Sequence, residues 1–155
     1  MRPPSPITWQ ARKVHGISTA DVADQPTFGE IADAVSAALG DAIPVGHNVR
    51  IDLDVLTRTL PNWTPTEAFD TLRLARKTWT LPSYRLGALV EHRNLAENLP
   101  SGLQPHRATY DALVTARLFI ALATEPSPLT VAALRDTGGI TLAPAEPEAE
   151  LRLFD

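Results

Sequence analysis

VGHNVRIDLDVL (45–56) places a His-Asn pair at a change of sequence pattern. The apolar run that leads into it, DAIPVGHN (41–48), is too short for a helix and predicts a buried strand. Beyond it, leucines recur at helical spacing until a proline, which predicts a helix over 52–60. These leucines are Leu53, Leu56 and Leu60. Polar side chains are therefore concentrated where a strand passes into a helix.

A second polar stretch, HRATYDA (106–112), places His106 five positions before Asp111. Pro105 suits the first turn of a helix, because its missing N–H costs nothing there, and we predict a helix from Pro105 to about Thr124. That helix is predicted to bury Ala108, Leu113, Ala116, Phe119 and Ile120. On its own, the His-Asp pair favours an ordinary helix entry over a catalytic site, so it is interpreted together with the rest of the chain.

The remaining segments predict further elements around these two stretches. Apolar residues recur at helical spacing over 28–39, after Thr27 as N-cap with Glu30 three residues later and before Gly40 as a stop. Residues 68–74 are compatible with a second strand, and residues 72–79 with a helix. The first eighteen residues show no clear periodicity and predict an irregular arm.

Composition limits the class of protein. At 155 residues the length suits one domain, and the absence of cysteine excludes disulfides and cysteine-ligated zinc. No apolar stretch is long enough for a membrane span and no signal-peptide pattern opens the chain, so we expect a cytoplasmic protein without a membrane partner. The net charge of −4 provides no global basic field, although an acidic protein can still bind nucleic acid through a local basic strip.

Together the two stretches resemble the DnaQ-like, DEDDh-type 3′–5′ exonuclease family. The matching residues are His47, Asn48 and Asp52, followed by His106 and Asp111. The resemblance extends in order from about residue 7 to residue 124 and includes VHGISTADVADQPTF (14–28), FDTLRLAR (69–76) and YRLGALVEH (84–92). It implies an α/β, ribonuclease H-like exonuclease fold that is N-terminally shortened, with a small parallel sheet flanked by helices.

The resemblance also implies roles for individual residues. Asp52 and Asp111 would be ligands of a two-ion Mg²⁺ or Mn²⁺ site, since hard cations prefer oxygen ligands. His106 would be the general base, because its ordinary pKa lies near neutral pH. Asn48 and Arg107 would contact the nucleic acid at its 3′ end. Three further arginines are expected near the phosphates: Arg50, Arg85 and Arg93.

The family's first motif, Asp-x-Glu, is missing from this sequence. Residues 1–13 contain no acidic side chain, so the chain offers two of the four expected carboxylates. We therefore expect weak or no activity from the chain alone, and an open strand edge that a homodimer or a strand-donating partner would cover. Pro44 is expected to blunt that edge. A fragment of a longer enzyme, a chain completed by a partner and a non-catalytic nucleic-acid or sliding-clamp adaptor all remain open.

The expected domain organisation is an N-terminal arm (1–18), a partial exonuclease domain (19–124) and a flexible tail (125–155). The tail contains Glu150-Leu151-Arg152-Leu153-Phe154, which resembles the Gln-Leu-x-Leu-Phe peptide by which bacterial replication proteins bind the sliding clamp. Leu151, Leu153 and Phe154 would fill its apolar pocket. Glu150 departs from the preferred glutamine, and the alternative is a segment that folds back on the domain.

Overall fold

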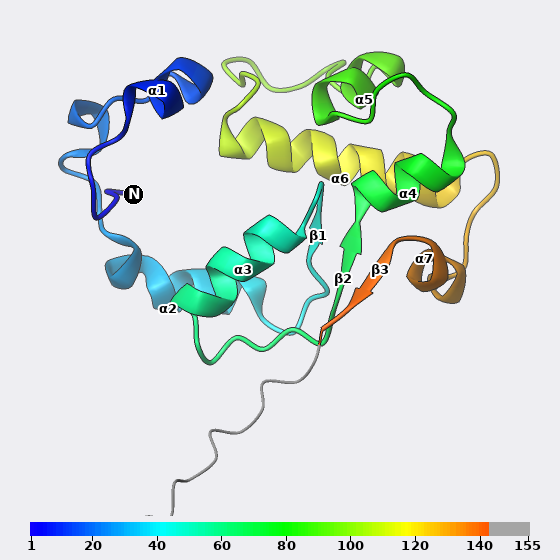
Figure 1. Cartoon of the computed structure of the whole chain (residues 1–155), viewed down its shortest axis with the longest axis horizontal. Helices are drawn as coiled ribbons and strands as arrows, with labels where there is room; N and C mark the ends of the chain where they lie inside the picture. Colours follow the sequence, from blue (N-terminus) through cyan, green and yellow to red (C-terminus); the bar gives the residue numbers. More distant parts are fainter. Residues whose placement is uncertain (143–155) are drawn as a thin grey trace, which may run out of the picture.

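The computed structural model describes residues 1–142. Its strands are β1 (Val45–Gly46), β2 (Glu67–Asp70) and β3 (Gly139–Thr141), shown in Figure 1. Its helices are α1 (Trp9–His15), α2 (Phe28–Leu39), α3 (Arg50–Thr59), α4 (Thr71–Thr78), α5 (Leu86–His92), α6 (Ala108–Thr124) and α7 (Val131–Gly138), with a short 3-10 turn at Ala20–Val22.

The sheet has the strand order β1-β2-β3. β1 and β2 are parallel, with Val45 opposite Phe69, as the prediction of a small parallel sheet requires. β3 is antiparallel to β2, with Ile140 opposite Ala68, so the complete sheet is mixed. The prediction of a flexible tail is wrong for residues 131–141, because α7 and β3 bury Leu134 and Ile140 in the folded domain.

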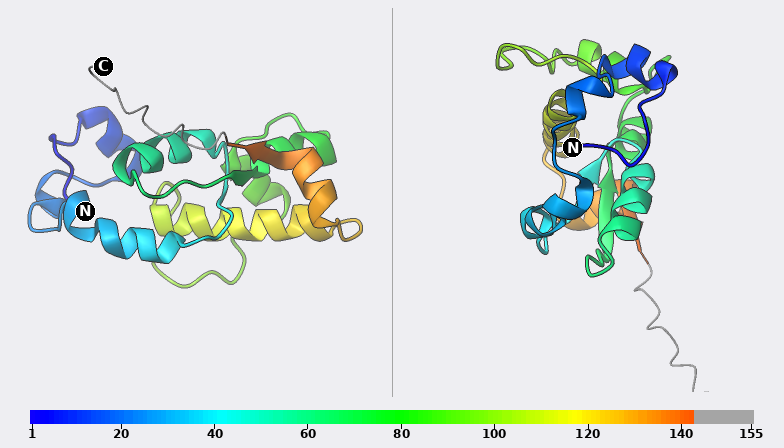
Figure 2. Two further views of the ribbon diagram at one scale, coloured as in Figure 1. Left: turned by 90° about the horizontal axis from the view of Figure 1, so that it is seen from below. Right: turned by 90° about the vertical axis from the view of Figure 1, so that its left-hand side faces the viewer.

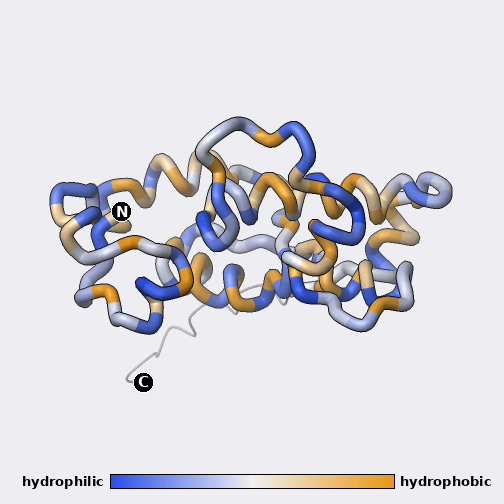
Figure 3. Tube along the Cα trace, turned by 90° about the horizontal axis from the view of Figure 1, so that it is seen from above, coloured by the Kyte–Doolittle hydropathy of each residue, from blue (hydrophilic) through white to orange (hydrophobic). Residues whose placement is uncertain are grey.

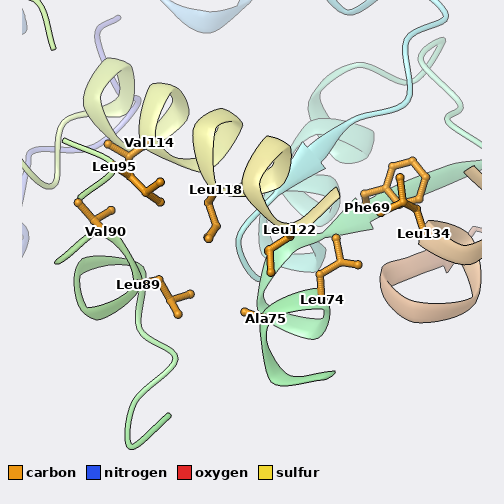
Figure 4. Packing of buried hydrophobic residues seen from close by; sticks show 10 residues of the cluster. All are labelled: Phe69, Leu74, Ala75, Leu89, Val90, Leu95, Val114, Leu118, Leu122 and Leu134. Atoms are coloured by element: carbon orange, nitrogen blue, oxygen red, sulfur yellow. The ribbon is translucent and has the colours of Figure 1, made fainter. Parts of the chain in front are cut away.

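Two apolar clusters cover the two faces of this sheet, because neighbouring strand residues point to opposite sides. Phe69 packs with buried residues of α4, α5, α6 and α7 (Figure 4), and its ring centroid lies 5.4 Å from that of Phe119 in α6. Ala68 packs on the other face with Leu53 of α3, and α2 packs against this second cluster. Figure 2 shows α3 and α6 on opposite sides of the sheet.

Helix α2 confirms its predicted boundaries. Thr27 Oγ1 accepts the N–H of Glu30, and Glu30 Oε2 accepts the N–H of Thr27, which completes a capping box. Helix α3 begins at Arg50, two residues before the predicted start. The N-terminal arm, predicted to be irregular, contains α1, which Thr8 caps at its start and Gly16 (φ 70°) ends in the left-handed region.

Helix α6 differs from its prediction in both start and buried face. It begins at Ala108 rather than Pro105, because His106 has a φ of 64° that no right-handed helix accommodates. Its buried residues are Val114, Thr115, Leu118, Ala121 and Leu122, whereas Ala108, Ala116 and Ile120 are exposed and Leu113 and Phe119 are half-buried. Apolar residues occur around most of this helix, so periodicity alone selected the wrong face.

Within residues 1–142, none of the helices combines the length and the apolar character that a membrane crossing needs. Figure 3 shows apolar and polar positions alternating along the helical segments, which is the pattern of helices that bury one face.

Candidate active site

The turn between β1 and α3 presents the first predicted site residues. Asn48 has a φ of 63°, a left-handed conformation that asparagine tolerates better than most residues. Its backbone N–H donates to Oδ1 of Asp70 at 3.0 Å. Gly46 is required just before the turn, because a Cβ there would lie 2.7 Å from Cγ2 of Val49. The backbone of the His-Asn segment is thus held from within the fold.

Asp70 is a buried residue that the sequence analysis did not single out. It is only 3% exposed, and besides Asn48 its Oδ1 accepts the N–H of Leu72 at 2.8 Å, which caps α4. A signal was present in the sequence, since an Asp-Thr pair where an apolar segment changes to helical spacing is a typical N-cap. One carboxylate therefore organises the ends of both parallel strands.

His47 connects the end of β1 to two other segments. Its Nε2 lies 3.0 Å from the carbonyl oxygen of Tyr84, which can only accept a hydrogen bond, so Nε2 carries a proton. Burial lowers the pKa of His47 and favours the neutral ring, whose Nδ1 lies 3.0 Å from the Thr71 hydroxyl; that hydroxyl in turn donates to the carbonyl oxygen of Gly46 at 3.2 Å. Both ring nitrogens of His47 thus contact protein atoms, as expected of a structural residue rather than a metal ligand.

Asp52 lies in the first turn of α3, downstream of the Asn48 turn. Its side chain is at the surface, where a ligand can reach it, and partial desolvation by the surrounding protein raises its pKa. A carboxylate is favoured at this place by the N-terminal end of the helix dipole. Asp52 therefore has the exposure and the ligand chemistry that its predicted role requires.

His106 and Asp111 are brought together by the turn that precedes α6. The backbone N–H of His106 donates to Oδ1 of Asp111 at 3.3 Å, and Asp111 lies in the first turn of the helix. Because His106 is left-handed and exposed, its ring projects from the turn rather than from the helix. The contact joins main chain to carboxylate and does not involve the imidazole.

Strand β1 contacts α6, towards which it points in Figure 1. The two halves of the predicted site therefore belong to neighbouring elements. Across residues 1–142, however, no three His, Asp or Glu side chains converge as a metal ion would require. The oxygen chemistry of Asp52 and Asp111 suits Mg²⁺ or Mn²⁺, but these two carboxylates alone do not build a two-ion site.

The predicted basic residues lie at the ends of three helices, with Arg85 as the exposed N-cap of α5. Arg107 is the N-cap of α6, next to His106, and Arg50 opens α3 beside Asn48. Arg93 is occupied elsewhere, because it pairs with Glu125 at the far end of α6 and lies over the Trp79 ring. These contacts hold Arg93 near the C-terminal end of α6, whereas His106 and Arg107 precede its N-terminal end.

The described fold, a small sheet between helices with a His-Asn strand end and a His-x-x-x-x-Asp helix entry, is of the ribonuclease H-like exonuclease type. The model of the RNase_T exonuclease family matches residues 1–119, and the chain belongs to this family. It is similar to exodeoxyribonuclease 10 of Escherichia coli K12, with 39% identity over 120 residues, 77% of this chain and 51% of that protein.

Two other similarities agree with this assignment. The DNA polymerase III subunit epsilon of Rickettsia typhi is 32% identical over 130 residues, 79% of this chain and 56% of its own length. A solved structure of exonuclease X in complex with 5′ overhanging duplex DNA superposes with a TM-score of 0.69 and 35% identity, covering 86% of this chain and 75% of the other. The chain thus spans about half the length of the sequence relatives it matches.

Proposed function

We propose that this chain is a 3′–5′ exonuclease domain in which His106 is the general base and Asp52 and Asp111 are metal-ligating carboxylates. The observation that carries the proposal is the turn before α6, which exposes the His106 ring beside Asp111 on a helix that contacts the His-Asn strand. The reaction would be hydrolysis of the last phosphodiester at a nucleic-acid 3′ end, with release of a nucleoside monophosphate.

Each residue has a separate role in this proposal. His106 takes the proton of the water that attacks the phosphorus, while the P–O3′ bond to the preceding nucleotide breaks. Asp52 and Asp111 offer carboxylate oxygens to divalent cations, which supply charge stabilisation when bound. Asn48 and Arg107 contact the nucleic acid, and Arg107 is placed for this by its position next to His106.

The two carboxylates are too few for a two-ion site, so we expect weak activity unless further ligands are added by a homodimer or a strand-donating partner. Within residues 1–142, β1 is an edge strand that pairs only with β2, which supports this expectation. The Pro44 carbonyl accepts the N–H of Phe69 at 2.9 Å, so the backbone of Pro44 faces β2 and that of Val45 faces outward. Pro44 therefore removes no donor from the open edge, contrary to the blunting role predicted for it.

Digestion of a 5′-labelled single-stranded oligonucleotide with Mg²⁺ or Mn²⁺ tests the proposal. Wild type is compared with H106A, D52A and D111A, and with D54A as a matched loss of an exposed carboxylate from the same helix as Asp52. Stepwise shortening that is lost in the first three variants and retained in D54A supports the proposed roles. Shortening that is unchanged in H106A and D111A contradicts them.

The second candidate function is a non-catalytic nucleic-acid or clamp adaptor, and the lack of a converging third ligand in residues 1–142 favours it. Oligonucleotide binding without shortening under any divalent cation would support this candidate.

The proposed clamp peptide, with Leu151, Leu153 and Phe154, lies outside the described residues. Titration of a labelled 146–155 peptide with a sliding clamp tests it, and no binding at high micromolar clamp would exclude it. A cytoplasmic location is part of the same proposal.

A further inference from the structure

Helix α1 carries an exposed aromatic ring that no role described above uses. Trp9 is 64% exposed, and it is the one aromatic among the large apolar residues exposed in residues 1–142. Lys13 lies one turn further along the same helix, with its Nζ 3.9 Å from the centre of the indole. A tryptophan usually buries most of its surface, so an indole held at the surface by a cation indicates a contact site.

The C-terminal end of α1 adjoins the turn that holds His106. A Cβ on Gly16, which ends α1, would lie 3.8 Å from Nη2 of Arg107. Asp21 lies near both Arg12 and Arg107. The pKa of Asp21 is lowered mainly by the hydrogen bond from the Ser18 N–H, and the charges of these two arginines lower it further. Arg12 therefore belongs to the same local cluster as Arg107.

The first twenty residues have a charge opposite to that of the protein as a whole, and Asp21, which follows them, lies near Arg12 and Arg107. Residues 1–20 contain Arg2, Arg12 and Lys13 and no acidic residue, whereas the entire chain has a net charge of −4. A cationic surface on an acidic protein attracts polyanions locally and repels them elsewhere. Phosphates are therefore directed to the side of the molecule where α1 and His106 lie.

We propose, on the basis of the exonuclease function above, that α1 is a platform for single-stranded nucleic acid next to the His106 turn. Trp9 stacks on a base, and Lys13, Arg12 and Arg107 contact consecutive phosphates. The seven residues of α1 extend over about 10 Å, the length of roughly three stacked nucleotides. The ring requires an accessible base face, which a single strand offers and the interior of a duplex does not, so the preferred ligand is a single-stranded 3′ tail.

Fluorescence anisotropy with a 5′-labelled oligonucleotide in EDTA tests binding without cleavage. Single-stranded DNA, single-stranded RNA and a blunt duplex of equal length are compared, because both single strands share the chemistry that the platform recognises. We expect single strands to bind more tightly than the duplex, and W9A to lose about ten-fold in affinity while W9F retains most of it. K13A is expected to reduce the slope of log K against log salt by about 0.7.

Two matched variants separate the platform from general effects. V14A removes an exposed apolar side chain from α1 itself, and K77A removes an exposed lysine from α4; both are expected to bind as wild type. Equal affinities of W9A and V14A, a preference for the duplex, or no binding by the folded wild type would each overturn the proposal. Binding through Trp9 without shortening in Mg²⁺ or Mn²⁺ would contradict only the exonuclease activity, so the two proposals fail separately.

Discussion

The buried carboxylate of Asp70 accepts the backbone N–H of Asn48 at 3.0 Å, across the carboxyl ends of two parallel strands. The same oxygen caps α4 through Leu72. Asn48 in turn leads directly into the helix that carries Asp52. The position of a predicted metal ligand thus depends on a side chain that touches neither metal nor substrate in the proposed reaction.

Replacing Asp70 by alanine is expected to destabilise the fold by about 2–3 kcal/mol, because a helix cap is lost and the N–H of Asn48 is left without its partner. D70N keeps an oxygen at the same place, so we expect it to lose clearly less unfolding free energy than D70A. Urea denaturation followed by circular dichroism measures both. Equal stability of D70A and wild type would show that water replaces the carboxylate.

The elements around the His-Asn pair were predictable, because their patterns are local. The capping box of Thr27 and Glu30 and the leucine spacing after Asp52 are decided within one or two turns of chain. The family resemblance added the correct order of segments and the pairing of the two motifs. None of this required a contact between distant residues.

The errors concern long-range contacts. The antiparallel partner of β2 comes from residues 139–141, about 70 residues away, and a three-residue strand has no periodicity to detect. The buried face of α6 depends on what packs against it, and the left-handed conformation of His106 depends on the turn it completes. For the same reason no sequence pattern showed that Arg107 reaches the end of α1.

The pKa of His47 predicts a pH dependence of stability. Because burial lowers the pKa in the folded state, the unfolded chain binds the proton more readily. The contribution to stability is therefore complete above the unfolded pKa of about 6.5 and is lost as the pH falls through the folded pKa. Denaturation midpoints measured between pH 8 and pH 5 test this.

The matched variant is H47Q, whose amide can donate to the Tyr84 carbonyl, as Nε2 of His47 does, without titrating. We expect the difference in unfolding free energy between wild type and H47Q to shrink as the pH falls below about 6.5. A difference that stays constant over this range would mean that His47 titrates alike in both states.

His106 is predicted to be catalytically important and conformationally costly. Its φ of 64° is a region that glycine enters freely and other residues enter at a cost of about 1 kcal/mol. H106G should therefore be as stable as wild type or slightly more stable. H106A should not be more stable than wild type, because alanine does not relieve the cost of this backbone conformation. Both variants should lose any metal-dependent shortening of the oligonucleotide. Activity retained in H106G, with the fold intact by circular dichroism, would remove His106 from the reaction.

Hydrogen exchange at β1 tests whether the outer edge of the sheet is open. The bonding direction alternates along a strand, so Gly46 turns its N–H towards β2 while Val45 turns its N–H away. In the isolated chain we expect the Val45 amide to exchange much faster than the Gly46 amide, measured by NMR after transfer into D₂O. A homodimer or a strand-donating partner that pairs with this edge would slow the exchange of the Val45 amide and leave the exchange rate of the Gly46 amide nearly unchanged. Protection at Val45 that increases with protein concentration would identify a second copy of the chain as that partner, and slow exchange at every concentration would show that the edge is already covered.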